Sequence, residues 1–296
     1  MKIKIARRNF IKRSGLITGG LILSGKLMAG STSKGNRSPL EFGVCTNLKN
    51  AEMLAGGYSY VEEGVRSFLV PDKSEEVFHE NLLLNEKSNL QVKACNSFLP
   101  GALKCVGENP AHDEILLFSE ITFSRAKQAG VKIIVFGSGS ARTIPDGFSR
   151  EKAQDQFIGL CKRIALIAGK YNTMIVIEPL NSEECNFINS VAEGGEIVKK
   201  VNHPNFMLLA DIYHMLKEEE KPETILSYGH LLKHVHIAEK DGRAAPGTHR
   251  EDFRPYFSAL KKINYTGKMS IECRWKDLQT EAPMALEYIK NQFKSI

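Results

Sequence analysis

The chain has 296 residues, 42% of them hydrophobic and 25% charged, which is typical of a globular protein rather than a collagen-like, coiled-coil or disordered one. Its net charge of +6 comes from the N-terminus: residues 1–29 hold seven Lys or Arg and no Asp or Glu, which leaves 33 basic and 34 acidic side chains in the remainder. A nearly neutral body has no broad positive field for DNA or RNA, so the charge argues against a nucleic-acid-binding protein.

Residues 1–29 have the features of an export signal. Residues 6–12 read Ala-Arg-Arg-Asn-Phe-Ile-Lys, which resembles the twin-arginine signature, and the weakly apolar run over 14–25 is shorter than a membrane span of about 20 residues. Leu27-Met28-Ala29 then offers small residues of the kind after which signal peptidase cuts. We expect a twin-arginine-type signal peptide over 1–29, a polar linker over 30–40, and a protein exported to the periplasm; an uncleaved anchor or a plain basic tail is the alternative.

Beyond residue 40, short apolar runs alternate with longer amphipathic stretches. The apolar runs predict eight strands, over 42–45, 58–61, 91–94, 132–136, 174–177, 206–210, 234–237 and 268–271. The stretches between them predict helices over 74–85, 112–129, 150–170, 191–201, 222–232, 252–263 and 283–293, with a short helix over 50–56. Gly130 and Gly267 stand where glycines that end a helix are expected.

Eight strand-then-helix units of about 33 residues each predict a single α/β domain over 41–296, a (β/α)8 TIM barrel. A doubly wound open sheet is the alternative, although it usually has five or six strands. The six cysteines form no CxxC pair and no regular framework, so we expect most of them to be buried as small hydrophobic residues. A bond between Cys95 and Cys105 is the one pairing that the sequence leaves open.

Four metal-binding side chains stand at the ends of the last four predicted strands, where a barrel enzyme places its catalytic residues. They are Glu178, Asp211, His236 and Glu272, separated by 33, 25 and 36 residues. A single acidic residue after a strand often caps a helix, but four in register on successive strands argue for one site. Three carboxylates and an imidazole suit one divalent cation, Mn²⁺ first, with Mg²⁺, Co²⁺ or Zn²⁺ as alternatives.

The segments around these residues carry a family resemblance. They read IEPLN, ADIYHM, HVHIAE and IECRW, in that order. Through them, over roughly residues 40–295, the chain resembles the xylose-isomerase-like barrel superfamily of sugar isomerases and epimerases, and its ketose 3-epimerases in particular. The resemblance implies a sugar or sugar derivative as substrate, and members of the superfamily often form dimers or tetramers.

The resemblance also implies roles for individual residues. The four residues at the strand ends would be the metal ligands, and Glu178 and Glu272 would also be the acid/base pair. His214, three residues after Asp211, would match the substrate-binding His of the family. Arg243 would match an Arg that follows the metal-binding His, but the spacing here is one residue longer, which bears on the size and orientation of the substrate.

Further candidate substrate contacts come from the other strand ends. Glu62 after the second predicted strand could reach a substrate hydroxyl, and Arg142 in the Gly-rich segment 137–142 could help to hold an anion. Trp275 could stack on a sugar face, and the segment 95–98 after the third predicted strand could form a wall of the pocket. Each has a purely structural alternative, as a loop or packing residue. His234 points to the same side of its strand as His236, and we expect it to fill a layer inside the barrel.

The expected chemistry is proton transfer next to a carbonyl. Such a proton is not acidic in water, but a metal on the carbonyl and hydroxyl oxygens would stabilise the enediolate that forms when a carboxylate removes it. The function that we predict is a divalent-metal-dependent sugar isomerase or epimerase. The alternatives are a lyase that eliminates from 3-keto-glycosides or related oxidised sugars at the same site, and a non-catalytic sugar-binding barrel. An endonuclease for abasic DNA shares the barrel, but the neutral body disfavours it.

Overall fold

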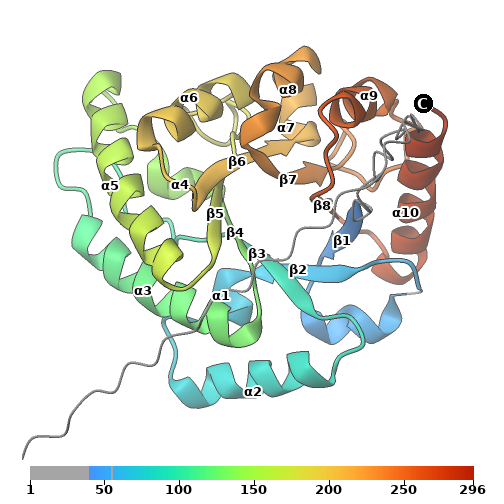
Figure 1. Cartoon of the computed structure of the whole chain (residues 1–296), viewed down its shortest axis with the longest axis horizontal. Helices are drawn as coiled ribbons and strands as arrows, with labels where there is room; N and C mark the ends of the chain where they lie inside the picture. The colour runs from blue at the N-terminus through green and yellow to red at the C-terminus, as the bar shows by residue number, and fades with distance from the viewer. Residues whose placement is uncertain (1–39, 55) are drawn as a thin grey trace, which may run out of the picture. The chain divides into compact units, whose positions relative to one another are not determined.

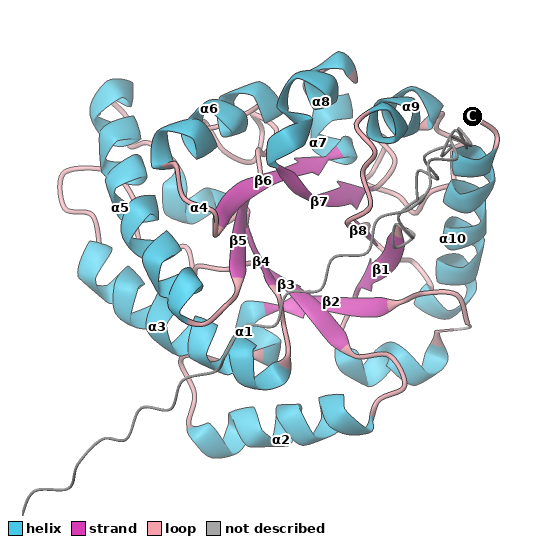
Figure 2. Ribbon diagram, viewed as in Figure 1, coloured by secondary structure: helices cyan, strands magenta, loops and turns pink. Residues whose placement is uncertain are grey.

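The computed structural model describes residues 40–54 and 56–296. Eight parallel strands form a closed barrel in which each strand pairs with the next along the chain and β8 pairs with β1 (Figures 1 and 2). The strands are β1 (Glu41–Cys45), β2 (Tyr60–Gly64), β3 (Val92–Asn96), β4 (Ile133–Phe136), β5 (Met174–Ile177), β6 (Phe206–Asp211), β7 (Leu232–Ile237) and β8 (Lys268–Ile271). The predicted (β/α)8 barrel is confirmed, and the open doubly wound sheet is excluded.

Helices surround the barrel and cover the outer faces of the strands (Figure 2). They are α1 (Val65–Phe68), α2 (Glu75–Lys87), α3 (His112–Ala129), α4 (Gly139–Arg142), α5 (Arg150–Lys170), α6 (Val191–Val201), α7 (Ile212–Lys217), α8 (Glu223–Tyr228), α9 (Arg254–Lys262) and α10 (Leu278–Lys294), with 3₁₀ turns at Leu48–Met53 and Gly229–Leu231. None of the helices in the described part of the chain is long and apolar enough to cross a bilayer. The expected signal peptide, and the linker up to residue 39, lie outside the described residues.

The strands separate two apolar layers. On β4, Ile134 packs into the large outer cluster shared with the helices, whereas Ile133 and Val135 belong to a smaller cluster on the other face. Because side chains alternate along a strand, the smaller cluster lies inside the barrel. Strands that are buried on both faces are mostly apolar, which is why these runs were recognisable from the sequence.

The second strand departs from its predicted range of 58–61. It begins at Tyr60 and continues through Glu62 and Glu63 to Gly64. The two carboxylates suggested that the strand had ended, but both are buried and hydrogen-bonded. Because both carboxylates have hydrogen-bond partners, the strand can continue beyond its apolar run into buried surroundings.

Other boundaries differ as well, and two of them have a clear local cause. The last helix begins at Leu278 rather than at 283, because the Asp277 side chain accepts a hydrogen bond from the Gln279 N–H and caps it, so that Pro283 lies within the helix. Gly130 does end α3 in the left-handed conformation, at φ +73°. Gly267 ends no helix, because α9 already stops at Lys262. The residue with a positive φ after this helix is Asn264.

The cysteines form no disulfide in the described residues, where all six are free thiols. Cys95 on β3 and Cys105 in the loop that follows it are both fully buried. Burial raises the pKa of each thiol, because it disfavours the thiolate. The bond that the sequence left open between these two cysteines is absent.

Candidate metal centre and active site

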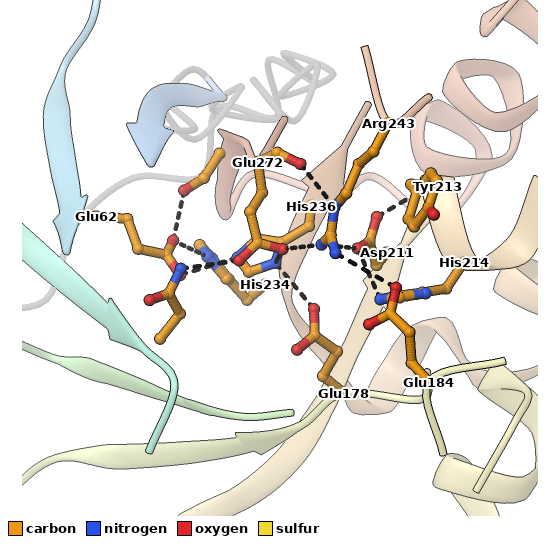
Figure 3. A network of polar contacts seen from close by, with 12 residues as sticks. Glu62, Glu178, Glu184, Asp211, Tyr213, His214, His234, His236, Arg243 and Glu272 are labelled. Carbon is orange, nitrogen blue, oxygen red and sulfur yellow. Dashed lines mark hydrogen bonds and ion pairs between the residues drawn. The ribbon is translucent and has the colours of Figure 1, made fainter. Parts of the chain in front are cut away.

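The four predicted metal-binding side chains converge at the carboxyl end of the barrel (Figure 3). Glu178 directly follows β5, Asp211 ends β6, His236 lies on β7 and Glu272 directly follows β8. One potential ligand atom of each lies within 4.8 Å of those of the others. His236 Nδ1 is 3.0 Å from Glu178 Oε1 and 3.2 Å from Glu272 Oε2. Strand order thus brings together residues that are up to 94 positions apart.

The charges of this cluster favour a cation. Burial raises the pKa of Glu178, and the neighbouring Glu272 raises it further. Burial also raises the pKa of Asp211 to about 7, against the opposing effect of Arg243. Three carboxylates are costly to bury together unless a positive group compensates them. The three carboxylates and the His236 ring are the ligand types that Mn²⁺, Mg²⁺, Co²⁺ and Zn²⁺ accept, so the residues present fit a divalent cation.

Arg243 supplies a positive charge beside the cluster. Its guanidinium donates to the Glu272 carboxylate, lies 3.3 Å from Asp211 Oδ2, and bonds the Glu272 carbonyl through Nε at 3.1 Å. The Cζ atom of Arg243 lies 4.6 Å from the centre of the Tyr213 ring, a cation–π contact. Burial opposes the ionisation of Glu272, but His236 and Arg243 outweigh it and lower its pKa to about 2. Glu178 and Glu272 therefore differ in their tendency to hold a proton.

His214 presents an N–H group at the site. The backbone N–H of Asn181 donates to His214 Nδ1 at 3.1 Å, so Nδ1 carries no proton. Burial lowers the pKa of His214 to about 3, so the ring is neutral and its proton lies on Nε2. That atom is buried, lies 3.4 Å from Asp211 Oδ2, and has no hydrogen-bond partner among the described residues. A substrate oxygen would satisfy it.

A cavity of about 280 Å³ opens above these side chains. Its polar lining comprises Asn96, Glu178, Glu184, His214, Arg243 and Glu272, and small residues over 137–141 form one wall. The cavity therefore exposes both members of the predicted acid/base pair, together with His214 and Arg243.

Asn96, from the segment that the sequence proposed as a wall of the pocket, lines this cavity, and so does Glu184, which the sequence did not single out. Glu184 Oε1 is 3.7 Å from the Arg243 guanidinium, and the Asn96 amide donates to Glu272 Oε1 at 2.8 Å. Asn96 ends β3, and its place at a strand end is what marked it in the sequence. Glu184 lies in the loop after β5, six residues beyond Glu178, where only the loop conformation brings it back to the site.

Three of the predicted substrate contacts do not line this cavity. Glu62 is fully buried between His234 and His236 inside the barrel. Arg142 is fully buried as well and donates to the Glu178 carbonyl at 2.6 Å, because the short helix α4 turns it inward. Trp275 is half-buried and donates to the Cys45 carbonyl at 3.2 Å. The structure thus shows each of them in contact with other protein groups, and Glu62 also lines a second cavity, which shares Asn96 with the first.

His234 lies where the sequence placed it. It is fully buried on β7, two residues before His236, and its ring centre is 4.9 Å from that of His236. Burial lowers its pKa, although the Glu62 carboxylate opposes this. His234 therefore belongs to the barrel interior beneath the candidate metal centre.

Comparison with known families matches residues 54–292 to the xylose isomerase-like TIM barrel model. L-ribulose 3-epimerase of Methylomonas sp. (strain DH-1) is 32% identical over 169 residues, which cover 50% of this chain and 58% of that protein. 3-Dehydro-D-guloside 4-epimerase of Escherichia coli (strain K12) is 30% identical over 109 residues, which cover 36% of this chain and 41% of that protein. The chain thus spans about half the length of these relatives.

A solved structure gives fuller coverage. The crystal structure of D-allulose 3-epimerase from Methylomonas sp. in complex with D-allulose matches with a TM-score of 0.73 and 25% identity, over 86% of this chain and 98% of that one. The relatives are sugar epimerases, and the family model covers most of the chain. On this evidence the chain belongs to the xylose isomerase-like TIM barrel family.

Proposed function

We propose that this protein is a divalent-metal-dependent sugar epimerase or isomerase that moves a proton at a carbon next to a carbonyl. The observation that carries the proposal is that Glu178 and Glu272 both line the cavity and both face His236 Nδ1. A bound divalent cation, Mn²⁺ in our proposal, would supply Lewis acidity to the substrate's carbonyl and adjacent hydroxyl oxygens. Glu178, Asp211, His236 and Glu272 would hold it.

The protein's own groups account for the rest of the chemistry. One of the two glutamates removes the proton and the other returns one, and their opposite pKa shifts suit an exchange of roles. His214 donates Nε2–H to a substrate oxygen. Arg243 and Glu184, which approach each other at the cavity wall, are placed to bind hydroxyl groups. Return of the proton to the same carbon gives epimerisation, and return to the neighbouring carbon gives isomerisation.

Deuterium uptake from D₂O tests this proposal. The Mn²⁺-loaded protein would be given ketohexoses, aldoses, inososes and 3-keto-glycosides, and proton NMR would follow exchange next to each carbonyl. We expect exchange with at least one substrate class, and its loss in Glu178→Gln and in Glu272→Gln. Glu220→Gln is the matched control, since Glu220 is a half-buried carboxylate that accepts from the Val191 and Ala192 N–H groups and lines neither cavity beside the ligand cluster. Absence of exchange with every substrate, despite bound metal, would contradict the proposal and favour a sugar-binding barrel.

A second candidate is an enzyme for oxidised glycosides, either an epimerase or a lyase that expels the aglycone. A second cavity of about 240 Å³, lined in part by Cys45, Asn47 and Glu63, adjoins the first and shares Asn96 with it. Two adjoining cavities favour a substrate larger than one sugar ring. One relative is named 3-dehydro-D-guloside 4-epimerase, which is consistent with such a substrate. With 3-keto-glycosides, a new sugar in the D₂O experiment would indicate epimerisation and a released aglycone would indicate elimination.

We also propose that residues 1–29 direct export by the twin-arginine route, on the basis of Arg7, Arg8 and the short apolar run that follows. Replacement of both arginines by lysine should leave the precursor inside the cell. Fractionation of cells that express the tagged full chain measures this. Export of the variant at the normal level would contradict the proposal.

A further inference from the structure

We propose that Glu62 is a positioning residue, which holds the His236 ring with Nδ1 directed at the metal centre. The role rests on the proposed function, because it concerns the cation that His236 would help to bind. Glu62 lies on β2, which faces β6 across the barrel and is separated from β8 by β1 (Figure 2). It was a predicted substrate contact, but its contacts assign it to the imidazole.

The carboxylate of Glu62 determines which nitrogen of His236 carries a proton. Glu62 Oε1 lies 2.9 Å from His236 Nε2, and both side chains are fully buried. An ionised carboxylate can only accept, so Nε2 keeps its proton. The lone pair of Nδ1 is then free for a cation on the side where Glu178 and Glu272 lie. A carboxylate behind a ligating histidine fixes both the tautomer and the ring orientation.

Glu62 is itself held in place by a chain of donors. Its Oε2 accepts from Ser270 Oγ at 2.6 Å and lies 2.7 Å from His234 Nε2. Since the Ser270 proton points to Glu62, the Tyr60 hydroxyl, 2.7 Å away, must donate to Ser270. Three side chains therefore direct protons at one carboxylate, which keeps it ionised. The carboxylate cannot turn away from His236 without losing these bonds.

The neutral variant Glu62→Gln should still fold. Its amide oxygen can accept from His236, and its amide N–H₂ would then face His234 Nε2. His234 Nδ1 has no hydrogen-bond partner among the described residues, so the ring can move its proton to Nδ1 and accept at Nε2. The substitution removes one negative charge behind His236 while it leaves the shape of the side chain nearly unchanged.

The test is the affinity for Mn²⁺, measured by calorimetry on the full-length wild type, Glu62→Gln and the matched control Glu220→Gln, whose carboxylate accepts from backbone N–H groups away from the site. We expect Glu62→Gln to bind Mn²⁺ roughly 10- to 100-fold more weakly, as is typical when such a partner is lost, and Glu220→Gln to bind as the wild type does. The visible spectrum of the Co²⁺-loaded protein should shift in Glu62→Gln only. A merely structural role would lower the Tm of the metal-free variant and leave both readouts of the folded protein unchanged.

The outcomes separate this proposal from the proposed function. Unchanged Mn²⁺ affinity and Co²⁺ spectrum in Glu62→Gln would overturn the role of Glu62 and leave metal-dependent catalysis standing. A wild type that binds neither ion would overturn both. If Glu62→Gln does not fold, Ser270→Ala removes one of the bonds that hold Glu62 and should weaken Mn²⁺ binding in the same direction by a smaller factor. Wild-type affinity in folded Ser270→Ala would then count against the proposal.

Discussion

Gly137, directly after β4, leaves room for the Glu178 carboxylate. A Cβ built on Gly137 would overlap Glu178 Oε2. The Gly-rich segment 137–142 was interpreted from the sequence as a loop that could hold an anion. In the structure its first glycine instead gives the Glu178 carboxylate, a candidate metal ligand, the space that a side chain at position 137 would take.

A methyl group at this position should therefore displace Glu178. We expect Gly137→Ala to weaken Mn²⁺ binding and slow deuterium exchange at least tenfold, since it moves a ligand that must be placed within a fraction of an ångström. Calorimetry and the NMR exchange assay measure the two effects. Gly159→Ala is the control, because a Cβ there meets nothing within 4 Å and lies on α5, away from the site. Equal Mn²⁺ affinity in the two variants would contradict this role for Gly137.

The limits of sequence reasoning about the site follow from where each residue stands. Glu178, Asp211 and Glu272 come at the point where an apolar strand stops, so the pattern itself marks them. Glu184 lies within a loop, and no periodicity indicates which way its side chain turns. The sequence did mark Glu62 at a strand end, as a candidate substrate contact. Only the structure shows that its side chain is buried against His236.

At the scale of the elements, long apolar patterns were predicted best. The ranges predicted for α3, α5 and α6 agree with the structure to the residue, since each repeats its apolar face over several turns. The short helices α1, α4 and α7 were missed, because four to six residues are too few to show a period. Helix α1 directly follows β2, α7 directly follows β6, and α4 begins three residues after the end of β4. All three therefore lie at the end of the barrel that carries the site.

The end of α3 offers a test of backbone conformation. Gly130 has a φ of +73°, and a Cβ there would meet nothing within 4 Å, so an alanine would bring strain without a steric clash. We expect Gly130→Ala to lower the free energy of unfolding by about 1 kcal/mol. Urea denaturation measures this. Gly159→Ala, in the interior of α5, should instead raise stability by about 0.5–1 kcal/mol, and a change of the same sign in both variants would contradict the explanation.

At the scale of the whole molecule, metal binding and stability should depend on each other through pH. Burial raises the pKa of Asp211 from 3.8 to about 7, so between these values the folded metal-free chain holds a proton that the unfolded chain has lost. This group therefore makes the free energy of unfolding fall as pH rises through that range. Above it, the ionised carboxylate is available to a cation, which no longer has to displace a proton.

We expect Mn²⁺ to raise the Tm more at pH 8 than at pH 6. Thermal unfolding with and without Mn²⁺ at the two pH values measures the difference. Asp211→Asn is the control, since it has no carboxyl group to titrate and should show a smaller dependence of the Mn²⁺ effect on pH. A gain in Tm that is the same at both pH values in the wild type would contradict the assignment.

The pairing of β8 with β1 has a consequence for how the protein is made. The barrel cannot close until residues 268–271 have been synthesised, and Glu272 follows them immediately. A chain that stops earlier, through a nonsense mutation or proteolysis, exposes the edges of β1 and β7, which invites aggregation. It would also lack one of the four candidate ligands. The complete set of candidate ligands is thus present only in a chain whose translation has passed β8.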